Sequence, residues 1–535
     1  MKRKESARGL SIHTLARYER VRYLLSNMKY LIIFFCSIIF LSKTNAQPLF
    51  SKLFDVNKQW ESIDRILVTE KGNYLYVGRS VNFFVNDSSK YRKIFILKLD
   101  SLFEIDTIVY LRENYRPYTS ASTIKNLNSS IVFGKNDSIL TNYDSYFLSN
   151  ISTNTLITRT IKLNFFTNTV LTSEAININN KLYFFCADYT TFVASKLKLS
   201  MQCMDTNGNL LWGKVFQDKR CYTNNVVQTK DGNFILAGLK YYGEGLGGDD
   251  SAFAWYAKVD TLGNIIWEHV LDRGSKLMST YVWATEANGN YYLSGTNYAK
   301  YTPTWYGDTS FSYIIKINEN NGEIEWQKRF LYSINRTSGL LTSMGGMRYY
   351  NGNMYGLLSH NVTNTSNQYV MFAKFDMKGN IVWKRLFQQA DYSNRAYSLT
   401  PIDDGFLICG DAKDSTRAKG DSDAWLIKTD TNGCIIPGCN AKDGIVQIIN
   451  PEKVFTVYPN PVQNEINVST ENLDIKIESL AIYNMQGQVL KFRQAQLPEK
   501  EITKINTEDL ANGNYLLIIT TNKQQMAGKK FVVER

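Results

Sequence analysis

Short apolar runs separated by polar turns dominate the chain between residues 60 and 433. One pattern recurs there: a polar turn, four or five apolar residues, and in most copies a Gly. Clear copies occupy 71–78, 231–238, 288–295 and 404–410, and weaker ones occupy 128–134, 180–186 and 352–358. Turn residues followed by β-branched and aromatic runs predict strands rather than helices.

A second pattern follows the first in many copies: a strand, an Asp turn, and a strand that contains Trp. Tyr256–Trp267 and Phe372–Trp383 have it in full, Met204–Trp212 has its second half, and Ile315–Trp326 has one extra residue. The first pattern occurs seven times, with a mean spacing of about 55 residues, close to the length of one propeller blade.

Four strand-like runs per repeat predict a β-propeller, because a single unit of this kind cannot bury its apolar faces and must stack on its neighbours. In the fourth copy these runs are 225–229, 233–239, 252–260 and 264–271. The last repeat ends at Cys434 without a Trp strand, and the segment 49–54 resembles the strand that it lacks. We therefore expect an all-β fold with a seven-bladed β-propeller at 47–439, whose last blade the N-terminal strand completes. Six or eight blades are the alternatives, since the second and third copies are degenerate.

The start of the chain has the pattern of an export signal. Within 28–46, Lys29 gives a positive start, 31–41 is apolar, and 44–46 is a small-residue cleavage site. The apolar run is short for a membrane span, so we expect no transmembrane segment in the mature protein. Since 1–27 is basic and polar and precedes Met28, we expect translation to start at Met28 and take 1–46 as leader and signal peptide.

A second domain is expected at 453–535, after a linker at 440–452. Alternating runs at 465–469, 477–483 and 515–521 predict a small Ig-like β-sandwich. This tail also contains a Pro-Asn-Pro turn, a Leu-x-x-Gly-x-Tyr stretch and a basic-then-apolar final strand. The residues of these motifs are Pro459, Asn460, Pro461, Leu510, Gly513, Tyr515 and Lys530.

The tail resembles the type A C-terminal sorting domain of the type IX secretion system found in bacteria of the Bacteroidetes kind. The resemblance implies that the outer-membrane secretion machinery recognises the motif residues after passage through the periplasm. It also implies that the tail is then removed, and that the passenger is released or attached to surface polysaccharide. We therefore expect a secreted or cell-surface protein.

The recurring polar residues of the second pattern are expected to be structural. A catalytic pair is needed once per molecule, whereas a residue present in nearly every repeat is explained more simply as a turn former or a contact between repeats. The recurring residues are Asp100, Asp205, Asp260, Asp376 and Asp430, Lys98, Lys258, Lys316, Lys374 and Lys428, and Trp212, Trp267, Trp326 and Trp383.

The Asp-x-x-Gly-x-x-x-Trp skeleton resembles the tryptophan-docked repeats of quinoprotein dehydrogenases. The adjacent-cysteine disulfide expected beside that cofactor is missing from the sequence, so neither the cofactor nor the activity is carried over. Outside the leader the chain has two histidines, His269 and His360, and neither lies in a catalytic motif. A net charge of +12 without a dense Lys/Arg run gives no indication of nucleic-acid binding.

Loops between the second and third strands of the repeats are the best candidates for a ligand face. Their acidic side chains could bind Ca²⁺, the one cofactor considered, and their aromatic rings could stack on a sugar. Alternatively, the Asp residues simply begin the third strand. The candidate residues are Asp249, Asp250, Trp305, Tyr306, Asp308, Asp421 and Asp423.

Two cysteines close to the end of the predicted propeller, Cys434 and Cys439, suggest a local disulfide in an oxidising compartment. Three others, Cys186, Cys203 and Cys409, lie in apolar strands and are expected to be buried.

Three functions remain open. The first is a secreted binding or scaffold module for a surface polysaccharide, an extracellular glycan or a protein. The second is an extracellular polysaccharide-active enzyme with acidic residues on the loop face, whose carboxylate pair would leave no spacing to detect. The third is a structural adhesin.

Overall fold

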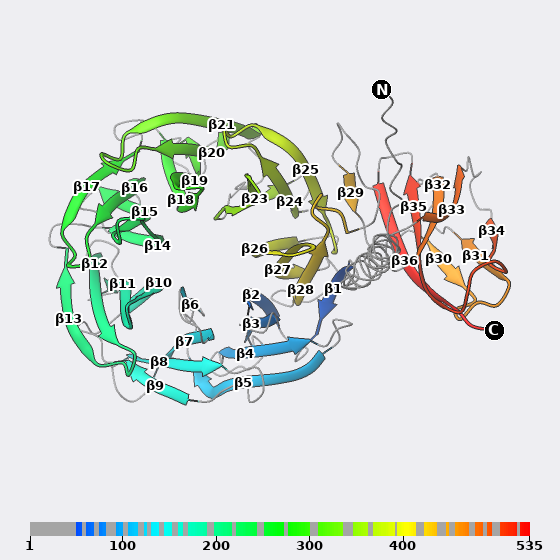
Figure 1. Ribbon diagram of the computed structural model, residues 1–535, viewed down its shortest axis with the longest axis horizontal. Helices are drawn as coiled ribbons and strands as arrows, with labels where there is room; N and C mark the ends of the chain where they lie inside the picture. Colours follow the sequence, from blue (N-terminus) through cyan, green and yellow to red (C-terminus); the bar gives the residue numbers. More distant parts are fainter. Residues whose placement is uncertain are drawn as a thin grey trace, which may run out of the picture. The chain divides into compact units, whose positions relative to one another are not determined.

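The computed structural model describes the greater part of the chain, and every regular element in that part is a β-strand, as the sequence predicts (Figure 1). The described residues are 50–55, 60–68, 74–81, 92–99, 105–115, 122–125, 130–137, 144–151, 159–163, 170–189, 197–216, 221–242, 251–271, 277–299, 309–334, 346–361, 368–390, 393–413, 422–435, 446–448, 455–469, 477–484, 489–494, 503–521 and 525–535. The expected leader and signal peptide lie outside them. Across the described residues, the structure contains no helix able to cross a membrane.

Antiparallel four-stranded sheets built from consecutive strands account for much of the region before residue 435. One sheet has the order β2 (Trp60–Val68), β3 (Tyr74–Val81), β4 (Arg92–Leu99) and β5 (Ile105–Tyr115). Another has the order β14 (Cys221–Gln228), β15 (Phe234–Tyr242), β16 (Ser251–Val259) and β17 (Ile265–Val270). A third has the order β18 (Leu277–Ala287), β19 (Asn290–Ala299), β20 (Thr309–Ile317) and β21 (Ile324–Ile334).

A fourth sheet combines the two ends of this region. Its order is β1 (Phe50–Phe54), β28 (Asp423–Thr429), β27 (Gly405–Lys413) and β26 (Ser393–Ile402). The N-terminal strand β1 runs antiparallel to β28, with Phe50 opposite Lys428 and Phe54 opposite Ala424 (Figure 1). This pairing covers an edge of β28 that would otherwise be open.

An eight-stranded sheet holds two further runs of four strands, joined where β10 pairs in parallel with β6. One run is β6 (Ser122–Lys125), β7 (Ser130–Asp137), β8 (Asp144–Ile151) and β9 (Arg159–Leu163). The other is β10 (Val170–Ile178), β11 (Lys181–Tyr189), β12 (Leu197–Asp205) and β13 (Leu210–Val215).

The remaining strands form a nine-stranded and a three-stranded sheet. The nine-stranded sheet has the order β22 (Arg348–Tyr350), β23 (Asn353–Asn361), β24 (Gln368–Phe375), β25 (Ile381–Phe387), β29 (Val446–Ile448), β36 (Gln525–Val533), β35 (Gly513–Thr521), β32 (Ile477–Asn484) and β33 (Val489–Gln494). The three-stranded sheet has the order β30 (Thr456–Tyr458), β31 (Glu465–Ser469) and β34 (Thr503–Asn506). The short strand β29 lies within the expected linker, where two aliphatic residues alternate with Gln447.

Residues of β15 explain why the middle strands of the repeats are apolar without alternation. Phe234 and Leu236 belong to a core shared with β11 and β12, whereas Ile235 and Ala237 belong to a core shared with β18–β20. Successive side chains of a strand point to opposite faces, so each face of this sheet packs on a different neighbour. Each fully buried Leu, Ile or Phe side chain stabilises the fold by about 1.5–3 kcal/mol.

Other sheets of the repeat region pack in the same way. In β27, Phe406 and Ile408 pack toward β23 and β24, whereas Leu407 and Cys409 pack toward β2–β4. The sheet of β26–β28 and β1 therefore shares a core with the sheet of β2–β5, which lies at the other end of the repeat region in sequence.

Tryptophan side chains of the fourth strands pack on the Asp turns of the next sheet. Gly379 has a φ of 77°, and a Cβ placed on it would lie 2.9 Å from the Trp326 ring. A Cβ placed on Gly433 would lie 2.5 Å from the Trp383 ring. A side chain other than hydrogen at these glycines would strain the backbone and push the ring away. Gly379 and Gly433 are therefore required for two reasons, the backbone conformation of the turn and the ring beside it.

The tail has a core of its own between two sheets. Its buried side chains include Phe455 and Ile466 on one side and Leu480, Leu517 and Phe531 on the other. The alternating runs of the sequence correspond to β31, β32 and β35.

Candidate functional site

The recurring Asp residues that the structure describes act as turn formers, and Asp100 lies outside the described residues. Asp260 Oδ1 accepts hydrogen bonds from Leu262 N (2.9 Å) and Asn264 N (2.7 Å), and Oδ2 accepts one from Asn264 Nδ2 (2.7 Å). Asp205 and Asp376 make the equivalent bonds in their own turns. Burial opposes ionisation of Asp260, but the hydrogen bonds from Asn264 outweigh it and lower the pKa of this carboxyl. These carboxylates therefore accept hydrogen bonds within their own turns.

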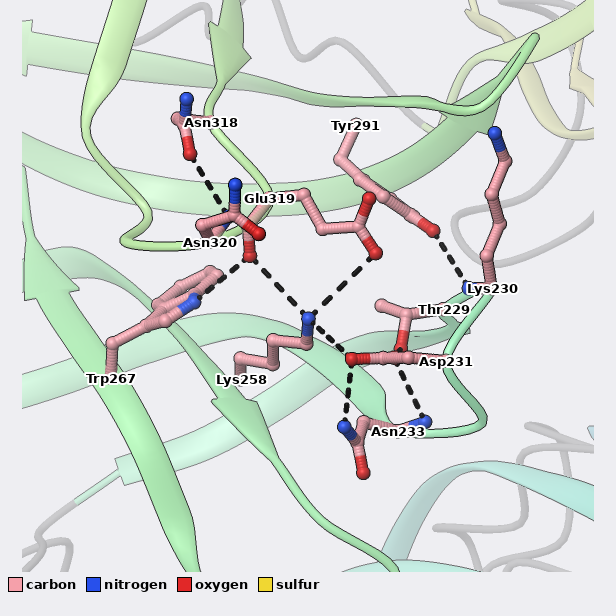
Figure 2. A network of polar contacts seen from close by, with 10 residues as sticks. All are labelled: Thr229, Lys230, Asp231, Asn233, Lys258, Trp267, Tyr291, Asn318, Glu319 and Asn320. Atoms are coloured by element: carbon pink, nitrogen blue, oxygen red, sulfur yellow. Dashed lines mark hydrogen bonds and ion pairs between the residues drawn. The ribbon is translucent and has the colours of Figure 1, made fainter.

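Lys258 lies at the centre of a polar network between two sheets (Figure 2). Its Nζ is 2.8 Å from Asp231 Oδ2 and 3.7 Å from Glu319 Oε1, and its side chain is 5% exposed. Asp231 belongs to the β14–β15 turn of the same sheet, whereas Glu319 belongs to the β20–β21 turn of the next. Burial raises the pKa of Asp231, but the hydrogen bonds from Lys258 and Thr229 exceed this effect, so the net shift is downward.

The same network ties the Trp of this sheet to the neighbouring turn. Trp267 Nε1 donates to the backbone oxygen of Glu319 (3.2 Å), which also accepts a hydrogen bond from Lys258 Nζ (3.5 Å) (Figure 2). In the sheet of β26–β28, Lys428 is fully buried and makes the corresponding ion pair with Asp404 at 2.7 Å. The recurring Lys and Trp residues therefore hold turns and sheets together here.

Most of the predicted ligand face lies outside the described residues. This applies to Asp249, Asp250, Trp305, Tyr306, Asp308 and Asp421. Asp423 is described: it is the first residue of β28 and is 4% exposed. Its position agrees with the alternative that an Asp begins the third strand.

Three carboxylates meet at the start of β28. Oxygen atoms of Asp55, Glu61 and Asp423 lie within 4.8 Å of one another, and Glu61 and Asp423 are buried whereas Asp55 is exposed. Carboxylate oxygens of this kind are ligands that Ca²⁺ accepts. The backbone here is tied across two sheets, because Glu61 N donates to Ser422 O at 2.7 Å.

A buried polar group that the sequence analysis missed lies on the β26–β27 hairpin. Asp411 is fully buried and accepts hydrogen bonds from Arg395 Nη2 (2.7 Å) and from the Tyr397 hydroxyl. Burial raises the pKa of Asp411, against the opposing effect of Arg395. In the hairpin register, Arg395 lies directly opposite Asp411. Aligning the two strands from the sequence would therefore predict that the two charges are neighbours.

The sorting motif of the tail is partly structural and partly exposed. Leu510 and Tyr515 are buried in the tail core. The Tyr515 hydroxyl donates to Ala511 O (2.6 Å), and its ring stacks on Phe531 with centroids 5.7 Å apart. Gly513 begins β35, the strand that carries Tyr515 into this core.

The Pro-Asn-Pro turn attaches the start of the tail to its last strand. The peptide bonds before Pro459 and Pro461 are both cis. Asn460 Oδ1 accepts a hydrogen bond from Val532 N (2.8 Å), and Val462 N donates to Val532 O (2.7 Å). Four residues of the motif are exposed and can be reached by a partner. They are Pro459, Asn460 and Pro461 of the turn and Lys530 of β36.

The cysteines follow two patterns. Cys434 is buried and disulfide-bonded, and since Cys439 lies outside the described residues, their pairing stays a prediction. Cys203, Cys221 and Cys409 are buried.

Two solved structures resemble the chain at low similarity. An apocarotenoid oxygenase variant from Synechocystis has a TM-score of 0.34 and 11% identity, over 52% of this chain and 63% of that chain. An acylaminoacyl peptidase from Pyrococcus horikoshii has a TM-score of 0.37 and 12% identity, over 77% of this chain and 58% of that chain. The chain thus spans less than two thirds of either structure, and TM-scores this low support no argument about its function.

The comparison with curated proteins finds no match. One family model does match, described as the secretion system C-terminal sorting domain, and it covers residues 456–534. These residues form the tail whose core and Pro-Asn-Pro turn are described above. The chain therefore carries a type IX secretion C-terminal sorting domain, which directs export to the cell surface or the medium.

Proposed function

We propose that residues 47–439 form a seven-bladed β-propeller and that the tail is an Ig-like sandwich. Seven runs of four strands support the count, with β1 as the fourth strand of the last run. The observation that carries the proposal is the docking of Trp267, Trp326 and Trp383 on turn glycines of the following sheets, as Trp326 docks on Gly379. Such contacts repeat from sheet to sheet, which is how propeller blades stack.

The propeller is proposed to act outside the cell as a binding or scaffold module, in a bacterium of the Bacteroidetes kind. The repeated Asp, Lys and Trp residues are used in turns and between sheets, so they do not form a shared catalytic centre. Recognition would fall to the loops that connect the second and third strands of each repeat. These loops lie at the same end of each sheet. The proposed ligand is a surface polysaccharide, an extracellular glycan or a protein.

The enzymatic alternative would place catalytic acids on that same loop face. Among the described residues, three carboxylates that lie within 4.8 Å of one another are those of Asp55, Glu61 and Asp423, and the last two are buried. A sugar ring would not reach buried carboxylates without a rearrangement of β28, so this group favours a structural role. Binding without turnover is therefore the preferred function.

Glycan arrays and surface polysaccharide from the producing cells test the proposal. The probe is the exported, tail-trimmed protein, and the matched variants are Asp249→Asn and Asp250→Asn together, and Trp305→Ala. We expect saturable binding that the loop variants weaken, with no release of reducing sugar. Turnover of the polysaccharide that these loop variants abolish would instead establish the enzyme.

A further inference from the structure

Strand β33 of the tail exposes an unusual run of apolar side chains. Val489, Leu490 and Phe492 are 52%, 43% and 65% exposed. Among the strands that the structure describes, β33 ends its sheet and pairs only with β32. Edge strands are normally kept from pairing by charge, Pro or bulges. β33 has two cations, Lys491 and Arg493, and a register shift opposite Tyr483, but its three exposed hydrophobic residues work against that protection.

The register of β33 separates its two faces chemically. Arg493 lies opposite Leu480, and Lys491 lies opposite Ile482. Directly opposed side chains share a face, so both cations lie on the face that carries the tail core. Phe492 lies opposite Ala481 and therefore on the other face. The open edge of β33 presents cations on one face and an aromatic ring on the other.

A groove of about 320 Å³ opens beside the cationic face. Its apolar lining comes from Leu480, Ile482 and Ile505, and so from both sheets of the tail, and Phe492 also borders it from the open edge of β33. Lys491 spans the two sheets at the groove, with Nζ 2.5 Å from Asp509 Oδ1. Arg493 also lines the groove and is exposed, and no carboxylate of the described residues pairs with it.

We infer that β33 is a docking edge for an extended strand of a partner protein in which acidic and apolar residues alternate. The strand would pair with the open edge of β33 by backbone hydrogen bonds. Its acidic side chains would reach Arg493 over the groove, and its apolar side chains would cover Phe492 and Val489. The inference rests on the export role of the tail and specifies how an export partner would hold it.

Charge complementarity disfavours a second copy of this strand paired around Lys491 as the occupant. In an antiparallel pair of two β33 strands centred on Lys491, that residue would face its own copy. Like charges directly opposite each other are destabilising. An acidic strand removes this repulsion and supplies the partner that Arg493 lacks.

Peptide binding to the full chain tests the docking edge directly. The probe is a labelled synthetic peptide of about six residues, one strand length, in which Glu alternates with Val. A Lys–Val peptide is the comparison, and fluorescence anisotropy is the readout. We expect the Glu–Val peptide to bind, Phe492→Ser to weaken binding about tenfold, and Arg493→Glu to reverse the preference toward the Lys–Val peptide.

Leu262→Ser is the matched control variant, because Leu262 is also 65% exposed but lies in the β16–β17 turn. It should leave peptide binding unchanged. Equal binding of both peptides by the unaltered chain, or a preference that Arg493→Glu does not change, would overturn the inference.

Export assays separate this inference from the role of the tail itself. In cells with a working type IX system, Phe492→Ser and Arg493→Glu should accumulate in the periplasm, whereas Leu262→Ser should be exported. If the unaltered chain needs its tail for export but both β33 variants are exported normally, the docking edge is wrong and the sorting role stands. If the unaltered chain is exported equally well without its tail, the sorting role itself fails.

Discussion

Replacing Lys258 with Met removes the charge at the centre of the network in Figure 2 and keeps most of the apolar stem. Lys258 donates a charged hydrogen bond to Asp231 at 2.8 Å from a site that is 5% exposed. Bonds to charged groups contribute about 1.5–3 kcal/mol. Asp231 is 46% exposed, so water hydrates its carboxylate in the variant and reduces the loss. We expect the free energy of unfolding to fall by about 1–2 kcal/mol.

Lys316→Met is the matched control, because Lys316 occupies the same repeat position in the next sheet. Its pair with Glu325 is 2.7 Å long, but its side chain is 23% exposed. A more exposed pair contributes about 0–1 kcal/mol. Urea unfolding followed by Trp fluorescence compares the two variants. Equal losses for Lys258→Met and Lys316→Met would refute the argument that burial makes the Lys258 network the stronger contact.

The Asp231 pair also predicts the direction in which pH changes the stability difference between the unaltered protein and Lys258→Met. The pKa of Asp231 is lowered in the folded protein, because its hydrogen bonds from Lys258 and Thr229 outweigh burial. A lowered folded pKa gives stability that is present above the unfolded value of about 3.9 and is lost as the pH falls below it. The gap between the unaltered protein and Lys258→Met should therefore stay constant from pH 7 to about 5 and shrink at lower pH. A gap that widens on acidification would contradict this.

Gly379→Ala, its control Gly232→Ala, and Asp411→Asn test other parts of the structure by the same urea assay, and Tyr515→Phe tests the tail by proteolysis. Gly379→Ala should cost about 1–2 kcal/mol for its positive φ, plus about 1–3 kcal/mol for the clash with Trp326. Gly232→Ala has a similar φ with open space around its Cβ, so it should show only the first cost, and equal losses would disprove the docking argument. Asp411→Asn should lose about 1–2 kcal/mol, because it removes the anion that Arg395 and Tyr397 bind, while the 39% exposure of the Arg395 side chain lets water reduce the loss; an unchanged midpoint would refute that. Tyr515→Phe should lower the stability of the tail by about 1 kcal/mol, read as faster trimming by added protease, and an unchanged rate would count against the Ala511 bond.

Local sequence patterns predict the strands well, because the apolar run and the turn residues that mark a strand lie within or beside that strand. The apolar run of Phe234–Leu239 falls within β15, and the Asp turn after Val259 follows from Asp260 and Gly263. The sequence pattern predicts the first run of that copy at 225–229, whereas β14 begins at Cys221. Its early residues, Cys221 to Asn224, mix polar and apolar types around a β-bulge, so periodicity does not mark them.

Contacts between distant strands could not be predicted in the same way. The tail motif identified the sorting domain because its residues are close in sequence and recur in a known family. The grouping of Asp55, Glu61 and Asp423 depends on where β2 and β28 meet, and no spacing in the sequence encodes that distance. The exposed edge of β33 depends on which strand lacks a neighbour, which is a property of sheet order and not of composition.

The most direct test of the account is the location and intact mass of the full chain beside a chain that ends at Ile449. Cell fractionation in a type IX-competent host gives the location, and mass spectrometry gives the trimming. We predict that only the full chain reaches the surface or the medium, and that it arrives without its tail. Export of both chains alike would contradict the central claim that residues 456–534 direct the protein out of the cell.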